Sequence, residues 1–305
     1  MDTIQKSLLE KLTDLHEIPE GAYNIRANGS LGARNTTANI DIVSKKDKDG
    51  IDIIIKPNTK NESVHIPVII SKTGIDDLVY NDFYIGENAD VTIVAGCGIH
   101  NTGDKKSSHD GIHTFHVGKN AKIKYVERHY GQGEGTGENV MNPTTVIEID
   151  DGGYMEMETT QIKGIDSTIR VTTASLGVDS KLVIRESLMT HGKQYAKTDF
   201  TVDLNGENSS ANVISRSVAK DESYQVFYSN IRGNNKCAGH TECDAIIMDK
   251  AKVSAIPEIS ANHIDASLIH EAAIGKIAGE QLMKLMTLGL TEQEAEEQIV
   301  NGFLK

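Results

Sequence analysis

The sequence predicts an all-β core folded as a β-helix, a solenoid of short stacked strands, with a short helix before the core and a helical hairpin after it. Three observations predict this fold. Short strand patterns fill the middle of the chain, one turn-and-strand unit recurs along it, and both ends show the 3.6-residue periodicity of helices. We therefore divide the 305-residue chain into an N-terminal helical segment (1–22), a β-helix core (23–262) and a C-terminal helical domain (263–305).

Residues 2–16 predict a short amphipathic helix. Apolar side chains recur there every three to four residues, which places five of them on one helical face: Ile4, Leu8, Leu9, Leu12 and Leu15. A helix with one apolar face needs a surface to cover, so we expect this helix to pack on another element.

The middle of the chain, from about residue 23 to residue 259, carries strand patterns and almost no helix signal. Short β-branched or alternating runs lie between turns rich in Gly, Asn and Asp. The clearest runs are 51–55, 64–70, 91–94, 122–126, 155–159, 169–173, 181–184 and 224–228. This region is therefore predicted to be all β.

A loose repeat organises the same region. Four stretches begin with Gly, reach Ala or Ser three residues later and continue as an alternating strand; they start at Gly86, Gly118, Gly177 and Gly206, 29 to 59 residues apart. A recurring turn-and-strand unit favours a solenoid whose repeats stack into one continuous core. A β-propeller is less consistent with the sequence, because no blade motif is visible.

The end of the chain predicts a helical hairpin over residues 279–304. Gly289 is a natural helix terminator, and Thr291 with Glu294 forms a capping box for the second helix. Both helices carry apolar residues that the hairpin cannot bury by itself, so we expect it to pack on the core or on a partner. The residues expected to dock a partner are Leu282, Leu285, Met286, Ile299 and Phe303.

Composition limits the function and the compartment. The formal net charge of −13 argues against binding to nucleic acid or to an anionic membrane surface, both of which attract a surplus of Lys and Arg. The chain has three cysteines, its first residues lack a continuous apolar stretch, and no apolar run is long enough to cross a bilayer. We therefore expect a cytoplasmic protein with reduced thiols.

Candidate ligands for a metal or cluster gather in the last third of the chain. Cys237, His240 and Cys243 lie close together, and His270 with Glu271 follows about 26 residues later. In an extended strand, Cys237 and Cys243 would project to the same side. Thiols, imidazoles and a carboxylate suit iron, sulfide or zinc. The Cys-x2-His-x2-Cys spacing is compatible with zinc, but no second close cysteine pair completes a tetrahedral set, which favours iron–sulfur chemistry.

The segments around these residues resemble one protein family. Five collinear blocks resemble the C-terminal signature of the SufB/SufD iron–sulfur cluster assembly family: His-Thr-Glu-Cys-Asp (240–244), Ala-Ile-Pro (255–257), His-Glu-Ala-Ala-Ile-Gly-Lys-Ile (270–277), Glu-Gln-Leu (280–282) and Ile-Val-Asn-Gly-Phe (299–303). A weaker likeness extends upstream through residues 95–97 and from His109 to residues 118–125. Five ordered blocks are harder to meet by chance than one short motif.

The resemblance implies a right-handed parallel β-helix and a scaffold protein rather than an enzyme. It implies that Cys243 receives sulfur or holds the nascent cluster, that Glu271 is its carboxylate partner across the site, and that His270 is presented at a subunit interface. Cys97 matches, less securely, the cysteine at which sulfur enters in the family. The expected product is an iron–sulfur cluster, either 4Fe–4S or 2Fe–2S.

The resemblance also implies partners. A SufC-type ABC ATPase would dock on the C-terminal hairpin, and a sulfur donor protein would supply sulfur. Because one chain carries both Cys243 and His270, a homodimer would suffice to build a site in which the Cys243 of one copy approaches the His270 of the other; a heterodimer with a paralogue is the alternative. ATP hydrolysis is expected only in the partner, because Gly275-Lys276 lacks the preceding glycine of a Walker A motif. The resemblance leaves the participation of a reduced flavin open, although no residue pattern supports one.

Two other functions stay open on sequence grounds. One is a SufD-like structural subunit without its own cluster, and the other is a β-helical polysaccharide lyase or hydrolase, for which Phe83-Tyr84 and Phe227-Tyr228 are the paired aromatic residues. The run His109, His113 and His116 suggests a metal site. However, His113 and His116 would face opposite sides of one strand, so we interpret the run as mostly structural.

Overall fold

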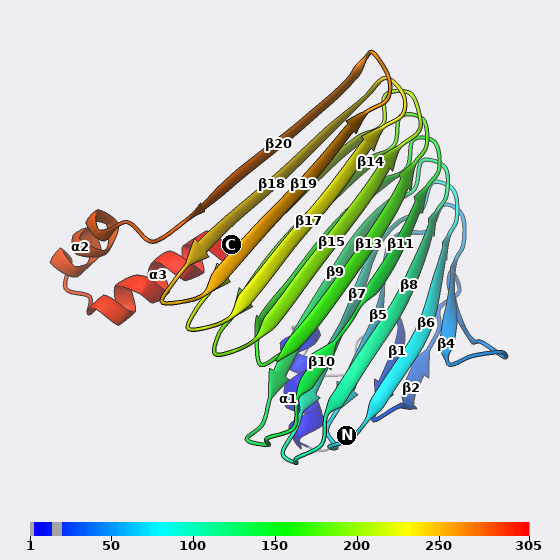
Figure 1. The fold of residues 1–305 in the computed structure, drawn as a ribbon. Helices are drawn as coiled ribbons and strands as arrows, with labels where there is room; N and C mark the ends of the chain where they lie inside the picture. The colour runs from blue at the N-terminus through cyan, green and yellow to red at the C-terminus, as the bar shows by residue number, and fades with distance from the viewer. Residues whose placement is uncertain (1–2, 14–19, 305) are drawn as a thin grey trace.

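The computed structural model describes residues 3–13 and 20–304, and it contains a parallel β-solenoid with one helix at its start and two at its end (Figure 1). The predicted fold class is confirmed. Within the described residues, the strands form two ten-stranded sheets that face each other across a common interior. We call one turn of the solenoid, a strand from each sheet with the loops between them, a rung.

The first sheet, which we call sheet A, contains strands that lie side by side in the order in which they are named here. They are β2 (Ser30–Asn35), β1 (Ala22–Ala27), β5 (Lys60–Ile70), β7 (Asp90–His100), β9 (Lys122–Gln132), β12 (Tyr154–Lys163), β14 (Lys181–Thr190), β16 (Ser210–Ala219), β18 (Cys237–Ile247) and β20 (Ala266–Gly275).

The opposite sheet, which we call sheet B, runs in the reverse order from the end of the chain. Its strands are β19 (Lys252–Ala261), β17 (Tyr224–Gly233), β15 (Tyr195–Leu204), β13 (Ser167–Leu176), β10 (Asn139–Met141) with β11 (Thr144–Ile149), β8 (Ser107–Val117), β6 (Asp76–Ile85), β4 (Gly50–Ile55) and β3 (Ile40–Ser44). All neighbours in the two sheets pair in parallel except β1 with β2 and β3 with β4, which are antiparallel and begin the solenoid.

The repeat predicted from the sequence is the corner at which the chain passes from sheet B to sheet A. The third residue of each repeat has a left-handed backbone, with φ between 54° and 59°: Asn88, Asn120, Asp179 and Asn208. Asn and Asp adopt this conformation more readily than other side chains. The Ala or Ser that follows is buried at the start of the next strand. Successive corners stack, and Asn208 Nδ2 donates a hydrogen bond to Asp179 Oδ1 at 3.1 Å.

Apolar side chains fill the interior because each strand turns every second residue inward. The main cluster runs from the first rungs to Cys237 and Cys243 near the end of the stack. Phe83 and Phe115 stack within it, with ring centroids 4.3 Å apart. Fully burying each such side chain contributes roughly 1.5–3 kcal/mol, so the continuous core supplies most of the driving force for folding.

The helices occupy opposite ends of the solenoid (Figure 1). Helix α1 (Thr3–Thr13) buries Leu8, Leu9 and Leu12, and it packs on β5, β7 and β9 as expected. The other residues predicted for this helix, Asp2 and residues 14–16 with Leu15, lie outside the described residues. In the described part of the chain, no helix combines the length and the apolar character needed to cross a membrane.

The predicted C-terminal hairpin is present as α2 (Gly279–Thr287) and α3 (Glu292–Leu304). The division at residue 262 needs one correction, however. Residues 266–275 form β20, which pairs with β18 along ten positions, so the solenoid extends well into the segment that we had assigned to the helices. The physical reason is that this segment satisfies its backbone hydrogen bonds by adding a strand to sheet A.

The last rung, formed by β19 and β20, is uncovered. Each of these strands pairs with a neighbour on one side only, β17 and β18 respectively. Its inward positions are therefore only partly buried or exposed: Ile259 is 42% exposed, whereas Ile231, its partner one rung earlier, is 2% exposed. The described part of the chain thus ends the solenoid with free strand edges and an apolar cross-section.

Candidate functional site

The candidate ligands lie on β18 and β20, and strand alternation divides them between two faces of sheet A. On β18, Cys237 and Cys243 point into the solenoid, whereas His240 points outward. On β20, His270 is half-buried and pairs with the buried Thr241, while Glu271 is exposed and pairs with the outward-facing Glu242. The prediction that the two cysteines share a side is confirmed. The five residues do not form one cluster.

The Cys243 side chain points into the solenoid, where buried polar side chains lie on the neighbouring strands. This side chain is 1% exposed, and the residue opposite it on β16 is Ser215. Burial, followed by the charges of Glu186 and Asp244, raises the pKa of the Cys243 thiol to about 12. The sulfur is therefore a protonated thiol near neutral pH. Because the thiolate is the nucleophile and the metal ligand, Cys243 is unreactive while it stays buried in this way.

His270 is the imidazole nearest to Cys243 on the interior face. Because it pairs with Thr241 rather than with residue 243, it is the diagonal neighbour of Cys243, about 8 Å away between Cα atoms from the spacing of strands and residues. Its Nδ1 lies 2.5 Å from Thr241 Oγ1, and its Nε2 is buried without a hydrogen-bond partner. Burial, and then His240, lowers the pKa of His270, so the ring is neutral and offers one free nitrogen.

Cys237 does not share a site with Cys243. Six residues of extended strand separate the two, which corresponds to about 20 Å. His240 lies midway and on the other face. The compact Cys-x2-His-x2-Cys spacing therefore cannot surround one zinc ion in this strand, and the zinc alternative is contradicted. Cys237 instead packs in the apolar core beside Ala266, and burial raises the pKa of its thiol.

On the outer face, three possible ligands converge across β18 and β20. His240 Nε2 lies 3.3 Å from Glu271 Oε2, and Glu242 lies directly opposite Glu271. One ligand atom from each of these residues lies within 4.8 Å of the others. Glu242 was not among the residues selected from the sequence. The register of β20 on β18 brings it to Glu271, and local sequence does not reveal that register.

A buried row of polar side chains runs through the interior toward Cys243. At its centre the Arg170 guanidinium contacts the Glu127 carboxylate, and both side chains are almost completely buried. Burial alone would raise the pKa of Glu127, but Arg170 and then His129 hold that pKa well below its usual value. Removing one partner of such a buried pair costs about 3–5 kcal/mol because it leaves the other charge unpaired.

The row extends on both sides of this ion pair. Tyr125 donates to Glu127 at 3.0 Å, and farther along Ser215 donates to Glu186 at 2.7 Å, one strand away from Cys243. Glu127 and Glu186 occupy inward positions of their strands. The sequence could have shown this only through strand alternation, which places a carboxylate at a position where apolar residues are expected. Two of their partners, Arg170 for Glu127 and Ser215 for Glu186, lie 43 and 29 residues away along the chain.

The three histidines of β8 lie on two different faces of the strand, as expected. His109 and His113 point inward, where His109 contacts Asp77 at 3.0 Å and His113 contacts Tyr125 at 2.8 Å. Burial lowers the pKa of His113 to about 4. His116 points outward and stacks on Tyr84. The three histidines therefore belong to two faces and do not form a metal site together.

Cys97 lies inside the early rungs and is fully buried. Burial, followed by the charges of Asp77 and Glu127, raises the pKa of its thiol well above the usual value. Helix α1 covers the outer face of the same strand at Gly98, where Leu8 and Leu12 lie within contact distance. A role as the point at which sulfur enters would require this region to open.

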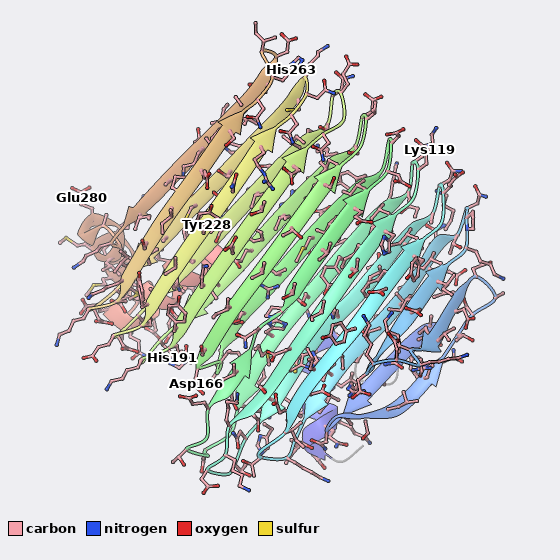
Figure 2. The ribbon with its side chains drawn as sticks, turned by 45° about the vertical axis from the view of Figure 1, so that its right-hand side comes forward. Lys119, Asp166, His191, Tyr228, His263 and Glu280 are labelled. Atoms are coloured by element: carbon pink, nitrogen blue, oxygen red, sulfur yellow. The ribbon has the colours of Figure 1, made fainter. Side chains whose placement is uncertain are left out.

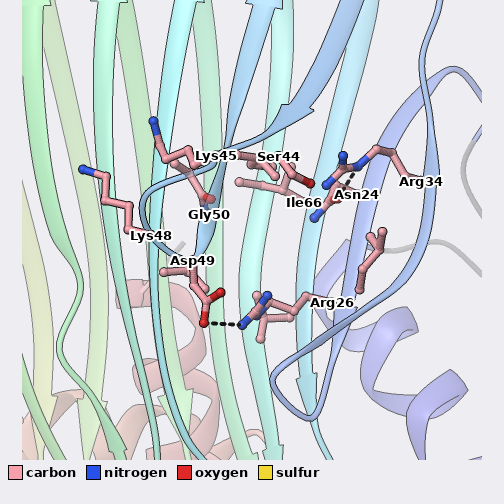
Figure 3. Close-up of a pocket in the computed structure, with 14 residues that line it drawn as sticks. Asn24, Arg26, Arg34, Ser44, Lys45, Lys48, Asp49, Gly50 and Ile66 are labelled. Atoms are coloured by element: carbon pink, nitrogen blue, oxygen red, sulfur yellow. Dashed lines mark hydrogen bonds and ion pairs between the residues drawn. The ribbon is translucent and has the colours of Figure 1, made fainter.

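A pocket at the start of the solenoid is lined by four cationic side chains: Arg26, Arg34, Lys45 and Lys48. Figure 3 shows Arg26 meeting Asp49 across this pocket and Arg34 beside Asn24. Arg26 also pairs with Asp77 at 2.8 Å, and Lys45 contacts both Asp52 and Asp82. Because carboxylates, an amide and, for Lys48, the Tyr80 ring already engage these cations, the pocket is a weak candidate for an anion site.

The five residues expected to dock a partner differ in how far they are buried. Phe303 packs with Val300 against Val218 and Met248 of the solenoid, so α3 is attached to the core. Leu282 and Leu285 are half-buried, as is Ile299, whereas Met286 is 43% exposed. Met283, which the sequence analysis did not select, is 66% exposed. Helix α2, which begins beside Glu280 in Figure 2, therefore carries the uncovered apolar surface of the hairpin.

Figure 2 shows the length of the last rungs, with His263 at the tip of one turn and Glu280 near the opposite end. His263 lies in the β19–β20 turn, and its Nδ1 accepts a hydrogen bond from the backbone of Asp265.

The fold and the site thus define a parallel β-solenoid with a buried thiol and a neutral imidazole beside its uncovered end.

Comparison with known families agrees with this description. The family model described as "SUF system FeS cluster assembly, SufBD core domain" matches residues 80–303. The chain belongs to the SufBD family of iron–sulfur cluster assembly proteins.

Individual relatives carry the same family name. A SufBD family protein of Methanocaldococcus jannaschii is 30% identical over 269 residues, which cover 86% of this chain and 84% of the relative. A Pyrococcus horikoshii relative is 28% identical, with 88% and 82% covered. A Methanothermobacter thermautotrophicus relative is 34% identical over 72% of this chain, but that match spans only 53% of the relative. The chain therefore spans most of some relatives and about half of others.

Proposed function

We propose that this chain is a scaffold on which an iron–sulfur cluster is assembled, with Cys243 as the thiol that receives sulfur or holds the nascent cluster. Family membership supports the class of function. One observation supports the site: the Cys243 thiol and the unpartnered Nε2 of His270 lie on neighbouring strands, on the interior face next to the uncovered end. Thiolate and imidazole are both ligands of iron–sulfur centres.

The raised pKa of Cys243 determines how such a site would load. The thiol must lose its proton before the sulfur binds iron, so iron binding and proton release are coupled. Raising the pH favours the thiolate and therefore favours loading, whereas lowering the pH opposes it. The burial of the sulfur also implies that access comes through the uncovered last rung rather than through either sheet.

Replacing Cys243 tests this assignment. We expect Cys243→Ser, after anaerobic incubation with ferrous iron and sulfide, to lose most of the iron and acid-labile sulfide bound by the wild type, because a hydroxyl is a poor ligand for soft centres. Cys237→Ser is the matched control, since it alters another interior thiol of the same strand about 20 Å away and should retain the cluster. Unchanged content in Cys243→Ser would place the cluster on other residues, whereas a wild type that binds no cluster would favour a structural subunit of the SufD type.

The uncovered last rung supports pairing between two copies of the chain. Free strand edges and exposed apolar side chains are unfavourable unless another chain covers them. A twofold interface is self-complementary, so two such ends can cover each other. Cys243 and His270 are already neighbours within one chain, and pairing would add the same two side chains from the second copy. A paralogue with a similar end would serve equally in a heterodimer.

A charge placed at this end tests the pairing. Ile259 and Ile256 are similarly exposed on β19, at 42% and 49%, but Ile259 faces the open interior and Ile256 faces outward. We expect Ile259→Lys to convert a dimer to a monomer in sedimentation velocity experiments, because the lysine would be buried at the interface, and we expect Ile256→Lys to leave the dimer intact. A wild type that is monomeric at micromolar concentration, or two variants with equal effects, would refute the interface.

The exposed face of α2 supports docking of a SufC-type ATPase. Apolar side chains gather there around a shallow groove lined by Leu282, Met283, Met286 and Glu292. Methionine side chains adapt readily to a partner surface. Helix α3 holds this face away from the core, because Val300 and Leu304 pack on the solenoid and Ser187 donates to the Leu304 carbonyl at 2.9 Å.

Point variants on α2 test this docking surface better than removal of the hairpin, which would uncover Val218 and Met248. We expect Met283→Asp combined with Met286→Asp to weaken binding of a SufC-type ATPase by at least about tenfold, as is common when central apolar contacts are lost. Binding would be measured by calorimetry, with Gln298→Asp on the exposed side of α3 as the control. Equal affinity for the variant and the wild type would place the docking surface elsewhere.

A further inference from the structure

We propose that His240, Glu242 and Glu271 form a ferrous iron site on the outer face of sheet A, separated by the sheet from the interior thiol Cys243. The geometry of these residues is the evidence that a divalent cation binds there. The choice of iron rests on the proposed function, because a protein that assembles an iron–sulfur cluster must receive ferrous iron as a substrate.

The first argument is the orientation of His240. Its Nδ1 lies 3.0 Å from the side-chain oxygen of Asn212 on β16, so the Nδ1 hydrogen is donated to that oxygen. In the neutral ring, Nε2 then carries a lone pair, and it lies 3.3 Å from a carboxylate oxygen of Glu271, which is also an acceptor. Two acceptors at this distance repel each other unless a proton or a metal ion lies between them. A second residue that fixes the tautomer in this way is typical of metal-binding histidines.

The second argument is charge. Glu242 and Glu271 are directly opposite each other on adjacent parallel strands, and like charges at such positions destabilise a sheet. Asp244 adds a third carboxylate on the same face, and Arg216 lies opposite Asp244 on β16. A divalent cation would relieve the repulsion that remains among the three carboxylates.

The third argument is distance. Metal bonds of about 2.0–2.2 Å to nitrogen and oxygen place adjacent ligands roughly 3.0–3.5 Å apart. The separation of 3.3 Å between His240 Nε2 and Glu271 Oε2 lies in this range. The third ligand lies within 4.8 Å, and a side-chain rotation of a partly exposed Glu242 would close that gap. One imidazole and two carboxylates suit a first-row divalent ion such as Fe²⁺.

The outer face of sheet B provides a comparison. His116 Nδ1 lies 2.8 Å from Glu148 Oε2, and the ring stacks on Tyr84. No further His, Cys, Asp or Glu of the described residues joins that pair within the same distance limit. An ordinary histidine–glutamate pair is therefore present in the same chain, and it serves as the internal control for the proposed site.

Anaerobic titration of the full chain with Co²⁺ tests the proposal, because cobalt reports its ligands by visible absorption. We expect one bound ion whose spectrum lacks a thiolate-to-cobalt charge-transfer band, and we expect an excess of Fe²⁺ to displace it. His240→Ala should weaken binding by at least about tenfold, and Asn212→Ala by about tenfold through loss of the orienting hydrogen bond. His116→Ala should bind cobalt as the wild type does. Circular dichroism would verify that each variant is folded.

Three results would overturn the site: no cobalt binding to the wild type, a thiolate band in its spectrum, or full affinity in His240→Ala. Each of these leaves the proposed function intact if iron and sulfide still load through Cys243. Conversely, cobalt binding that follows the expected pattern in a protein that never forms a cluster would retain the cation site and refute the scaffold function.

Discussion

Each strand of the solenoid directs successive side chains to opposite faces, and in-register parallel pairing carries that alternation from one rung to the next. Inward positions form one continuous core, and outward positions form rows on two broad faces. A residue at position 243 and a residue at position 242 therefore occupy different environments although they are covalent neighbours. This constraint sets the burial of Cys243, its raised pKa, and the separation of the thiol from His240 and Glu271.

The uncovered last rung is a second consequence of the same construction. A solenoid buries each rung by adding the next, so the rung at which stacking stops exposes the side chains that every earlier rung hides. Ile259 shows the effect directly, because Ile231 one rung earlier is almost completely buried. The interior chemistry near Cys243 and His270 therefore lies close to an end of the described stack at which the inside is accessible without opening a sheet.

The sequence predicted the features that are local and missed those that depend on register. The corner repeat was recognisable because Asn88, Asn120 and their equivalents occupy a backbone conformation that few residue types tolerate. The shared side of Cys237 and Cys243 followed from alternation alone. Alternation does not say which side faces inward or how β20 aligns with β18, so Glu242 was missed and His240 was grouped with the thiols. The assignment of residues 266–275 to the helical segment has the same origin, because that strand exists only through pairing with β18.

The rate of alkylation at neighbouring positions tests the division of the site most directly. In a chain whose native cysteines are replaced by alanine, single cysteines would be introduced as Thr241→Cys or Glu242→Cys, or retained at Cys243. We predict that the cysteine at 242 reacts with iodoacetamide at a rate near that of the unfolded chain. The cysteines at 241 and 243 should react at least about 100-fold more slowly, because a buried thiol with a raised pKa holds very little thiolate at pH 8. Equal rates at 242 and 243, or faster reaction at 243, would contradict the account.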